Sequence, residues 1–271
     1  MMPSSGCLRP RRFNRVEAGP ADRETVVLLH AVGLDLTYWD RQIEALADRY
    51  RVVAVDLPGH GMSDPPPRNA GIGHLAQDVA DIVEADAGGS AHIVGHSFGG
   101  MIAQQLALSR PGLVKSLTLI ATAATFTDET RAFMRSHAAS VRQDGMGAVV
   151  PLVTNWLAPA TVERRPDILD RLEKSIRAMD AAVYAPAWDR IAHFDAADQL
   201  AALTCPTLVV AGGRDTNTPV ADVTLLAKAI PHAELSVIAD AAHMIPLDTP
   251  DRLNKELLGF LATVGPCPRT R

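Results

Sequence analysis

A serine at position 97 stands between two glycines in the pentapeptide Gly-His-Ser-Phe-Gly at residues 95–99. A short apolar run precedes it, and an apolar helical pattern begins at Met101. A serine on such a strand-to-helix turn holds its hydroxyl above the edge of a sheet, and the flanking glycines let neighbouring backbone come close. The free N–H groups at the start of the helix would add a positive dipole end behind the hydroxyl. This pattern predicts that Ser97 is a nucleophile.

A serine hydroxyl needs a neighbouring base to take its proton, and the base needs an acid to orient it. Two later segments supply these groups, first an acid and then a histidine. Asp215 follows an apolar run at residues 208–211, and His243 follows another at residues 235–238. Because the carboxyl ends of parallel strands meet at one edge of a sheet, we expect Ser97, Asp215 and His243 to converge there. We interpret His243 as general base and then general acid, and Asp215 as the group that fixes its tautomer.

Other residues compete for these roles. Asp240 is close to His243 in sequence and is the alternative acid, although it stands outside the position expected for one. His96 adjoins the nucleophile, but we expect its side chain to leave the turn in another direction. We interpret three further histidines as ordinary buried or surface residues: His92, His193 and His232. The sequence shows neither metal-ligand spacing nor a phosphate-binding loop with its lysine, so we expect no metal and no cofactor.

The negative oxygen that forms during acyl transfer needs two preorganised N–H donors. The backbone N–H of Phe98, directly after the nucleophile, is the first donor that we expect. The second should come from the loop His-Ala-Val-Gly at residues 30–33, where small residues let the backbone approach the site. We favour the N–H of Val32, with Ala31 or Gly33 as the alternatives.

Short continuous runs of Val, Ile and Leu recur along the chain between longer stretches of helical periodicity. A continuous apolar run indicates a strand buried on both faces, whereas apolar residues three and four apart indicate a helix. We expect strands at residues 25–29, 51–56, 91–95, 115–120, 207–211 and 234–238. We expect helices at residues 42–46, 75–84 and 101–108. The alternation predicts an α/β fold with a mostly parallel central sheet flanked by helices. Before residue 25 only residues 13–18 look extended, so the N-terminal edge of the sheet is short or not readable.

The alternation is interrupted once, by residues 125–203, which carry no strong strand signal. Four prolines divide this stretch into several expected helices: Pro151, Pro159, Pro166 and Pro186. We predict a helical cap inserted into a hydrolase core of residues 25–124 and 204–264, with a tail or short edge strand at 1–24 and a tail at 265–271. Candidate substrate contacts are His30 and three aromatic residues of the cap, which are as readily part of its core: Trp156, Tyr184 and Trp188.

The composition of the 271 residues, 47% hydrophobic and 21% charged, is that of a globular chain able to bury a large core. A net charge of −5 gives no reason to expect nucleic acid or an anionic membrane as a partner. The basic start of the chain lacks the apolar segment of a secretory signal, and we expect a solvated tail there. The three cysteines, Cys7, Cys205 and Cys267, lie far apart, a pattern that suits a reducing cytoplasm.

Five segments in order resemble the α/β-hydrolase superfamily. They are HAVG at 30–33, DLPGHGMSD at 56–64, GHSFGG at 95–100, GGRDTNTP at 212–219 and ADAAHM at 239–244. The resemblance implies the same fold with a triad at Ser97, Asp215 and His243. A narrower resemblance is to 3-oxoadipate enol-lactonases, and it rests on residues 38–42, 144–146, 155–159, 184–185 and 205–212.

That narrower resemblance implies hydrolysis of a small anionic enol-lactone. The chain departs from the enol-lactonase pattern at His30-Ala31, where that family usually has Asn-Ser, and at His96 and Phe98 beside the serine. Three arginines are candidates for binding a substrate carboxylate: Arg131, Arg135 and Arg190.

These observations favour hydrolysis of a carboxylic ester or lactone of a small molecule through an acyl-enzyme on Ser97. The same groups could cleave a carbon–carbon bond or perform perhydrolysis with peroxide, because fold and triad do not fix the reaction. A third interpretation is a ligand receptor with slow turnover, whose cap aromatics close on a small apolar ligand. Turnover separates the classes, since an enzyme cycles freely whereas a receptor reacts once. The sequence does not indicate an oligomeric state.

Overall fold

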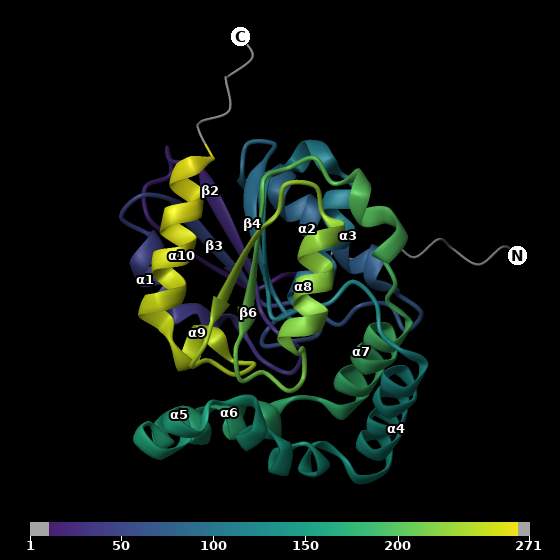
Figure 1. The fold of residues 1–271 in the computed structure, drawn as a ribbon. Coiled ribbons are helices and arrows are strands. Elements are labelled where there is room, and N and C mark those ends of the chain that lie inside the picture. The colour runs from purple at the N-terminus through teal and green to yellow at the C-terminus, as the bar shows by residue number, and fades with distance from the viewer. Residues whose placement is uncertain (1–10, 265–271) are drawn as a thin grey trace, which may run out of the picture.

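A sheet of seven strands organises residues 11–264, the part of the chain that the computed structural model describes (Figure 1). The strands are β1 (Arg15–Ala18), β2 (Thr25–Leu29), β3 (Arg51–Val55), β4 (Ala91–His96), β5 (Val114–Ile120), β6 (Thr207–Gly212) and β7 (Glu234–Ile238). Their order across the sheet is β1-β3-β2-β4-β5-β6-β7. All neighbours are parallel except β1, which runs antiparallel to β3. The α/β fold with a mostly parallel sheet is therefore confirmed.

The central strands β2 and β4 are buried along their whole length, which is why they read as continuous apolar runs. The edge strand β1 differs from them, because it pairs on one side only and most of its four residues are exposed. Its sequence, Arg-Val-Glu-Ala, carries no apolar run. The weak extended signal before residue 25 thus corresponds to one short antiparallel strand.

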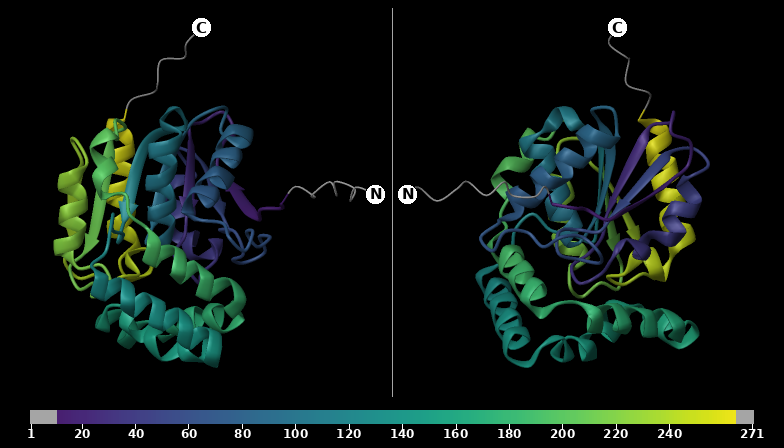
Figure 2. Two further views of the ribbon diagram at one scale, coloured as in Figure 1. Left: turned by 90° about the vertical axis from the view of Figure 1, so that its right-hand side faces the viewer. Right: turned by 180° about the vertical axis from the view of Figure 1, so that it is seen from behind.

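Helices cover both faces of the sheet. The helices of the core are α1 (Asp40–Leu46), α2 (Ile72–Asp86), α3 (Phe98–Ser109), α8 (Val220–Ala229), α9 (Ile245–Asp248) and α10 (Pro250–Thr263). The helices α1 and α10 lie together on one face, and α2, α3 and α8 cover the other (Figures 1 and 2). None of the helices within residues 11–264 combines the length and the apolar character that crossing a membrane requires.

Four helices between β5 and β6 form a separate layer beyond the carboxyl ends of the strands (Figures 1 and 2). They are α4 (Asp128–Asp144), α5 (Pro159–Arg164), α6 (Pro166–Ala178) and α7 (Ala181–His193), with a 3-10 helix, η4 (Val150–Trp156), between α4 and α5. Pro159 and Pro166 begin α5 and α6, where a missing N–H costs nothing. The expectation that Pro186 separates two helices is wrong, because it lies inside α7. A proline inside a helix removes one backbone hydrogen bond and crowds the carbonyl four residues earlier, yet α7 continues through Pro186.

Candidate active site

Ser97 occupies the turn between β4 and α3, with the left-handed backbone angles φ 52° and ψ −114°. Such a backbone is strained for a residue with a side chain, and hydrogen bonds hold it in place. The Ser97 N–H donates to the carbonyl of Ile120 at 2.9 Å, and the Ser97 carbonyl accepts from the Thr122 hydroxyl at 2.8 Å. A Cβ on Gly99 would lie 2.3 Å from the carbonyl oxygen of Leu29 in β2. The glycine therefore lets α3 begin directly against β2.

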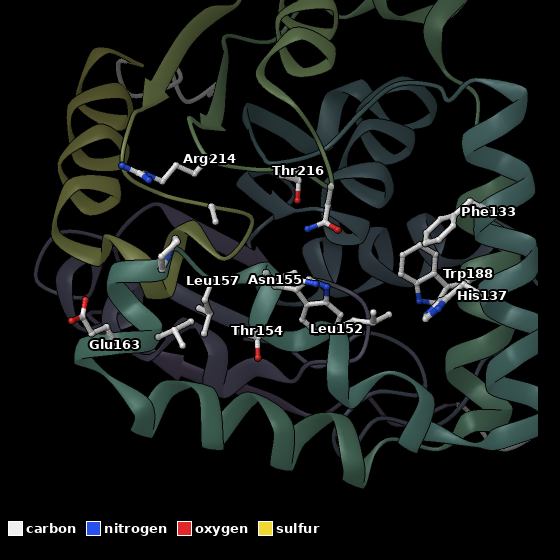
Figure 3. A pocket seen from close by; sticks show the side chains of 15 residues that line it. Phe133, His137, Leu152, Thr154, Asn155, Leu157, Glu163, Trp188, Arg214 and Thr216 are labelled. Atoms are coloured by element: carbon white, nitrogen blue, oxygen red, sulfur yellow. The ribbon is translucent and has the colours of Figure 1, made fainter.

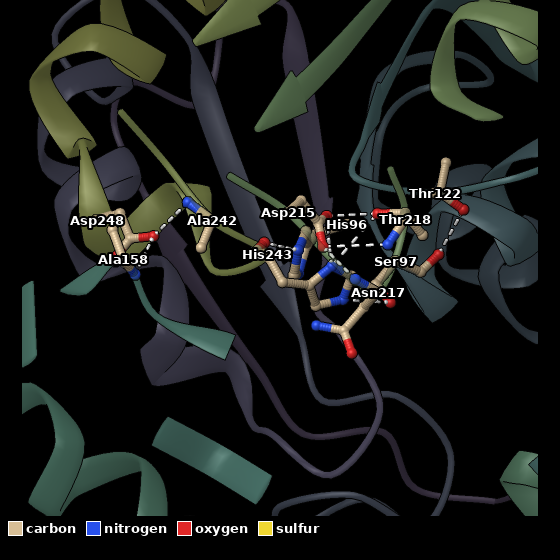
Figure 4. A network of polar contacts seen from close by, with 10 residues as sticks. All are labelled: His96, Ser97, Thr122, Ala158, Asp215, Asn217, Thr218, Ala242, His243 and Asp248. Atoms are coloured by element: carbon tan, nitrogen blue, oxygen red, sulfur yellow. Dashed lines mark hydrogen bonds and ion pairs between the residues drawn. The ribbon is translucent and has the colours of Figure 1, made fainter. Parts of the chain in front are cut away.

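The hydroxyl of Ser97 contacts a histidine, which in turn contacts an acid, and both come from the ends of two other strands (Figure 4). The Nε2 of His243 lies 3.1 Å from the Oγ of Ser97, and its Nδ1 lies 2.8 Å from the Oδ2 of Asp215. The exposed fractions of His243 and Asp215 are 7% and 6%. A buried imidazole between a carboxylate and a hydroxyl can draw a proton from the hydroxyl while the carboxylate stabilises the resulting charge.

The carboxylate of Asp215 is held on both oxygens. Its Oδ1 accepts the backbone N–H groups of Asn217 at 2.8 Å and of Thr218 at 3.1 Å, and its Oδ2 accepts the Thr218 hydroxyl as well as His243. Burial by itself would raise the pKa of Asp215, but the neighbouring imidazole and these hydrogen bonds outweigh it and lower the pKa. The carboxylate therefore stays ionised and oriented towards His243.

The alternative acid does not reach the histidine. Asp240 is exposed, and no hydrogen bond of the described residues joins its carboxylate to His243. Nor do residues 11–264 bring together three or more His, Cys, Asp or Glu side chains that could hold a metal ion.

The two residues expected to supply N–H donors to a negative oxygen both lie near Ser97. Phe98 begins α3 directly after the nucleophile, and Val32 lines the compartment that contains Ser97. Ala31 lines that compartment too, whereas Gly33 turns away at φ 80° and packs under α6 and α7. The loop after β2 thus offers Val32 or Ala31 as the partner of Phe98 in binding a negative oxygen.

Two adjoining cavities lie at the site, and their volumes differ about tenfold. The small compartment, about 60 Å³, is lined by both Ser97 and His243. The large cavity, about 660 Å³, lies between the loop after β6 and the helical layer (Figure 3). Trp156, Trp188 and Asn217 line both cavities and so stand at the boundary between them.

The residues that sequence reasoning selected for the pocket divide into two pairs. Trp156 and Trp188 line it, but His30 and Tyr184 are fully buried and line neither cavity. The His30 ring binds backbone on both sides, since its Nδ1 donates to the carbonyl of Ala31 at 2.7 Å and its Nε2 accepts the N–H of Leu57 at 3.0 Å. Burial lowers the pKa of His30 to about 4, so the ring is neutral and holds the loop after β2 in place.

The three arginines selected as carboxylate ligands lie elsewhere. Arg131 is engaged with Asp195 and with backbone carbonyls of the helical layer, Arg190 donates to the carbonyl of Ala70, and Arg135 is exposed. The arginine that lines the large cavity is Arg214 (Figure 3). In the sequence, only the position of Arg214 directly before Asp215 could have indicated that it lies near the site.

Sequence reasoning also missed a contact behind the site. The Nε2 of His96 lies 2.8 Å from the backbone carbonyl oxygen of His243, and the two rings are 5.0 Å apart. The His96 side chain hydrogen-bonds the loop that carries His243 and does not line the compartment that contains Ser97. It therefore links the serine turn to the histidine loop.

The histidine loop is tied to the helical layer as well. The N–H of Met244 donates to the carbonyl of Trp156 at 3.0 Å. The half-buried carboxylate of Asp248 accepts the N–H groups of Ala158 at 3.0 Å and of Ala242 at 2.8 Å (Figure 4). Trp156, which lines both cavities, is thus fixed relative to His243 through backbone hydrogen bonds.

Known proteins share this arrangement. Residues 24–250 match the model of the alpha/beta hydrolase fold family. The chain is 31% identical to 3-oxoadipate enol-lactonase 2 of Acinetobacter baylyi, over 89% of this chain and 90% of that protein. It superposes on the enol-lactonase from Burkholderia xenovorans LB400 with a TM-score of 0.88 and 26% identity, over 93% of this chain and 97% of that one. A thermophilic esterase from Thermogutta terrifontis gives a TM-score of 0.87 and 29% identity, over 94% of both chains. The chain therefore belongs to the alpha/beta hydrolase fold family.

Proposed function

We propose that this protein is a serine hydrolase that cleaves a carboxylic ester or lactone of a small molecule through an acyl-enzyme on Ser97. The observation that carries the proposal is the continuous chain of contacts from Asp215 through His243 to the Ser97 hydroxyl, 2.8 Å and 3.1 Å long. The relatives named as an enol-lactonase and an esterase support a lactone or an ester as the substrate class.

In the first half of the reaction, His243 Nε2 takes the proton of Ser97 as the serine oxygen attacks the carbonyl carbon. The negative oxygen of the tetrahedral intermediate accepts hydrogen bonds from the N–H groups of Val32 and Phe98. The bond to the leaving oxygen then breaks, and His243 gives its proton to that oxygen. In the second half, water loses a proton to His243 and attacks the acyl carbon, after which Ser97 leaves with the proton.

The proposal is tested by hydrolysis of a panel of p-nitrophenyl esters and simple lactones. Ser97→Ala should abolish multiple turnover while the protein stays folded. Ser116→Ala is the matched control, because the Ser116 hydroxyl also contacts a histidine ring, but that of His92 instead of His243. Full turnover in Ser97→Ala would remove the serine from the mechanism. Absence of turnover on every substrate would favour carbon–carbon cleavage, perhydrolysis or a receptor.

A further inference from the structure

The small compartment at Ser97 has an apolar wall. Seven of the side chains that line it carry neither nitrogen nor oxygen: Ala31, Val32, Met101, Phe126, Met134, Ile191 and Met244. Four of these, Met101, Phe126, Met134 and Ile191, come from α3, from α4 and the segment before it, and from α7. These four lie outside the loops that carry Asp215 and His243, whereas Met244 directly follows His243. The volume of the compartment, about 60 Å³, is about a tenth of the 660 Å³ of the large cavity.

The large cavity also has apolar walls, which include Phe133, Leu152 and Leu157, but it adds polar side chains that the small compartment lacks. These include Asn155, Arg214 and Thr216 (Figure 3). It is also lined by Ala242, the residue directly before the histidine. Its volume of about 660 Å³ leaves room for a group far larger than the small compartment accepts.

The direction of proton transfer decides which part of a substrate each cavity receives. The leaving oxygen must come within hydrogen-bond reach of His243 Nε2, because that atom returns the proton to it. The leaving group therefore lies on the histidine side, where Ala242, directly before His243, lines the large cavity and not the small compartment. The acyl chain extends from the same carbonyl carbon in the other direction, towards the wall formed by Met101 and Met134.

On the basis of the proposed function, we infer that the small compartment binds the acyl group and the large cavity binds the alcohol. The preferred substrates are then esters of short acids, such as acetate and butanoate, with a larger alcohol. A lactone is accepted when its substituent is on the carbon that bears the ring oxygen, since that carbon belongs to the leaving group. A substituent beside the lactone carbonyl would have to enter the small compartment.

The acyl side is tested with p-nitrophenyl esters from acetate to octanoate. In the wild type, kcat/KM should fall by about tenfold or more between butanoate and octanoate, because one methylene too many in a closed apolar pocket already costs about tenfold. Met134→Ala should recover octanoate hydrolysis by removing part of the wall. Met146→Ala is the control, since both methionines are 7% exposed but Met146 lines neither cavity.

The alcohol side is tested with two isomeric lactones, a γ-butyrolactone with a butyl group on the γ carbon and one with it on the α carbon. The γ isomer should be hydrolysed faster by about tenfold or more. A faster α isomer, or equal rates along the acyl series with turnover that Ser97→Ala abolishes, would overturn the inference and leave the proposed function intact. If no substrate is turned over and a small fluorophosphonate does not label Ser97, the proposed function fails and the inference fails with it.

Discussion

Replacing His96 tests whether the serine turn and the histidine loop are coupled through one hydrogen bond. The side chain is fully buried, and burial lowers its pKa to about 3, so the ring is neutral at physiological pH. A backbone carbonyl only accepts, so the single ring proton sits on Nε2 and points at the carbonyl of His243, 2.8 Å away. On its other side the ring stacks on Tyr38, with centroids 5.3 Å apart.

Two variants of nearly equal size separate the hydrogen bond from the packing. In His96→Gln the amide N–H can take the place of the imidazole Nε2–H, whereas His96→Met fills a similar volume without a donor. The methionine leaves a buried carbonyl unpaired, which costs about 1–3 kcal/mol of stability. A histidine loop displaced by about 1 Å would lower the rate about a hundredfold. We therefore expect kcat of His96→Met to fall by about 10–100-fold with little change in KM, and His96→Gln to recover most of it.

The measurement is kcat and KM on the best ester of the panel, together with urea unfolding of all three proteins. The glutamine variant should be more stable than the methionine variant by about 1–3 kcal/mol. Wild-type kcat in His96→Met would refute the coupling. Equal losses of kcat in both variants would refute the hydrogen bond and leave only the stacking of the ring.

Three further predictions concern stability. Gly99→Ala should lower the free energy of unfolding by about 1–3 kcal/mol and lower kcat, because its Cβ would lie 2.3 Å from a backbone oxygen at the end of β2. Gly73→Ala in α2, where no atom lies within 4 Å of the added Cβ, is the control. Equal urea unfolding of the two variants would contradict this prediction. Burial lowers the pKa of His30 to about 4 and of His60 to about 3, from 6.5, so the unfolded chain binds protons that the folded chain does not. The free energy of unfolding should stay constant above pH 6.5 and decrease below that pH by about 1.4 kcal/mol per pH unit for each histidine. Equal free energies of unfolding at about pH 7 and about pH 5 would exclude this contribution of the two histidines. Asp248→Ala should cost about 1–3 kcal/mol, since it leaves two backbone N–H groups without an acceptor, and an unchanged urea midpoint would speak against that role.

The positions of the serine, acid and histidine could be predicted because each follows a strand that is legible in the sequence. A strand buried on both faces is mostly apolar, as β6 is with its run Leu-Val-Val-Ala at residues 208–211. Once the parallel order is inferred, the residues that follow such strands must share one edge of the sheet. The short edge strand β1 lacks this signature because solvent covers most of its residues.

The pocket could not be predicted in the same way. Tyr184 and Trp188 are four residues apart in α7, so helical periodicity places them on one face. Yet Tyr184 is buried against Gly33, while Trp188 reaches both cavities. The difference depends on how α7 sits over the loop after β2, and no local pattern in the helix records it. The same holds for His96, whose partner lies 147 positions later in the chain.

The way in which the helical layer is attached explains how one fold can keep its chemistry and change its substrate. Trp156 meets the histidine loop through its own carbonyl and the N–H of Met244, and Ala158 meets Asp248 through its N–H. Three of these four partner groups are backbone atoms, which remain when a side chain is replaced. Side chains that project from the layer into the cavities, such as Met134 and Trp188, can therefore change the space around Ser97 without releasing the loop that orients His243. Selectivity for the acyl group and the alcohol should then follow the cavity-lining residues of this layer, while the reaction at the carbonyl carbon stays the same.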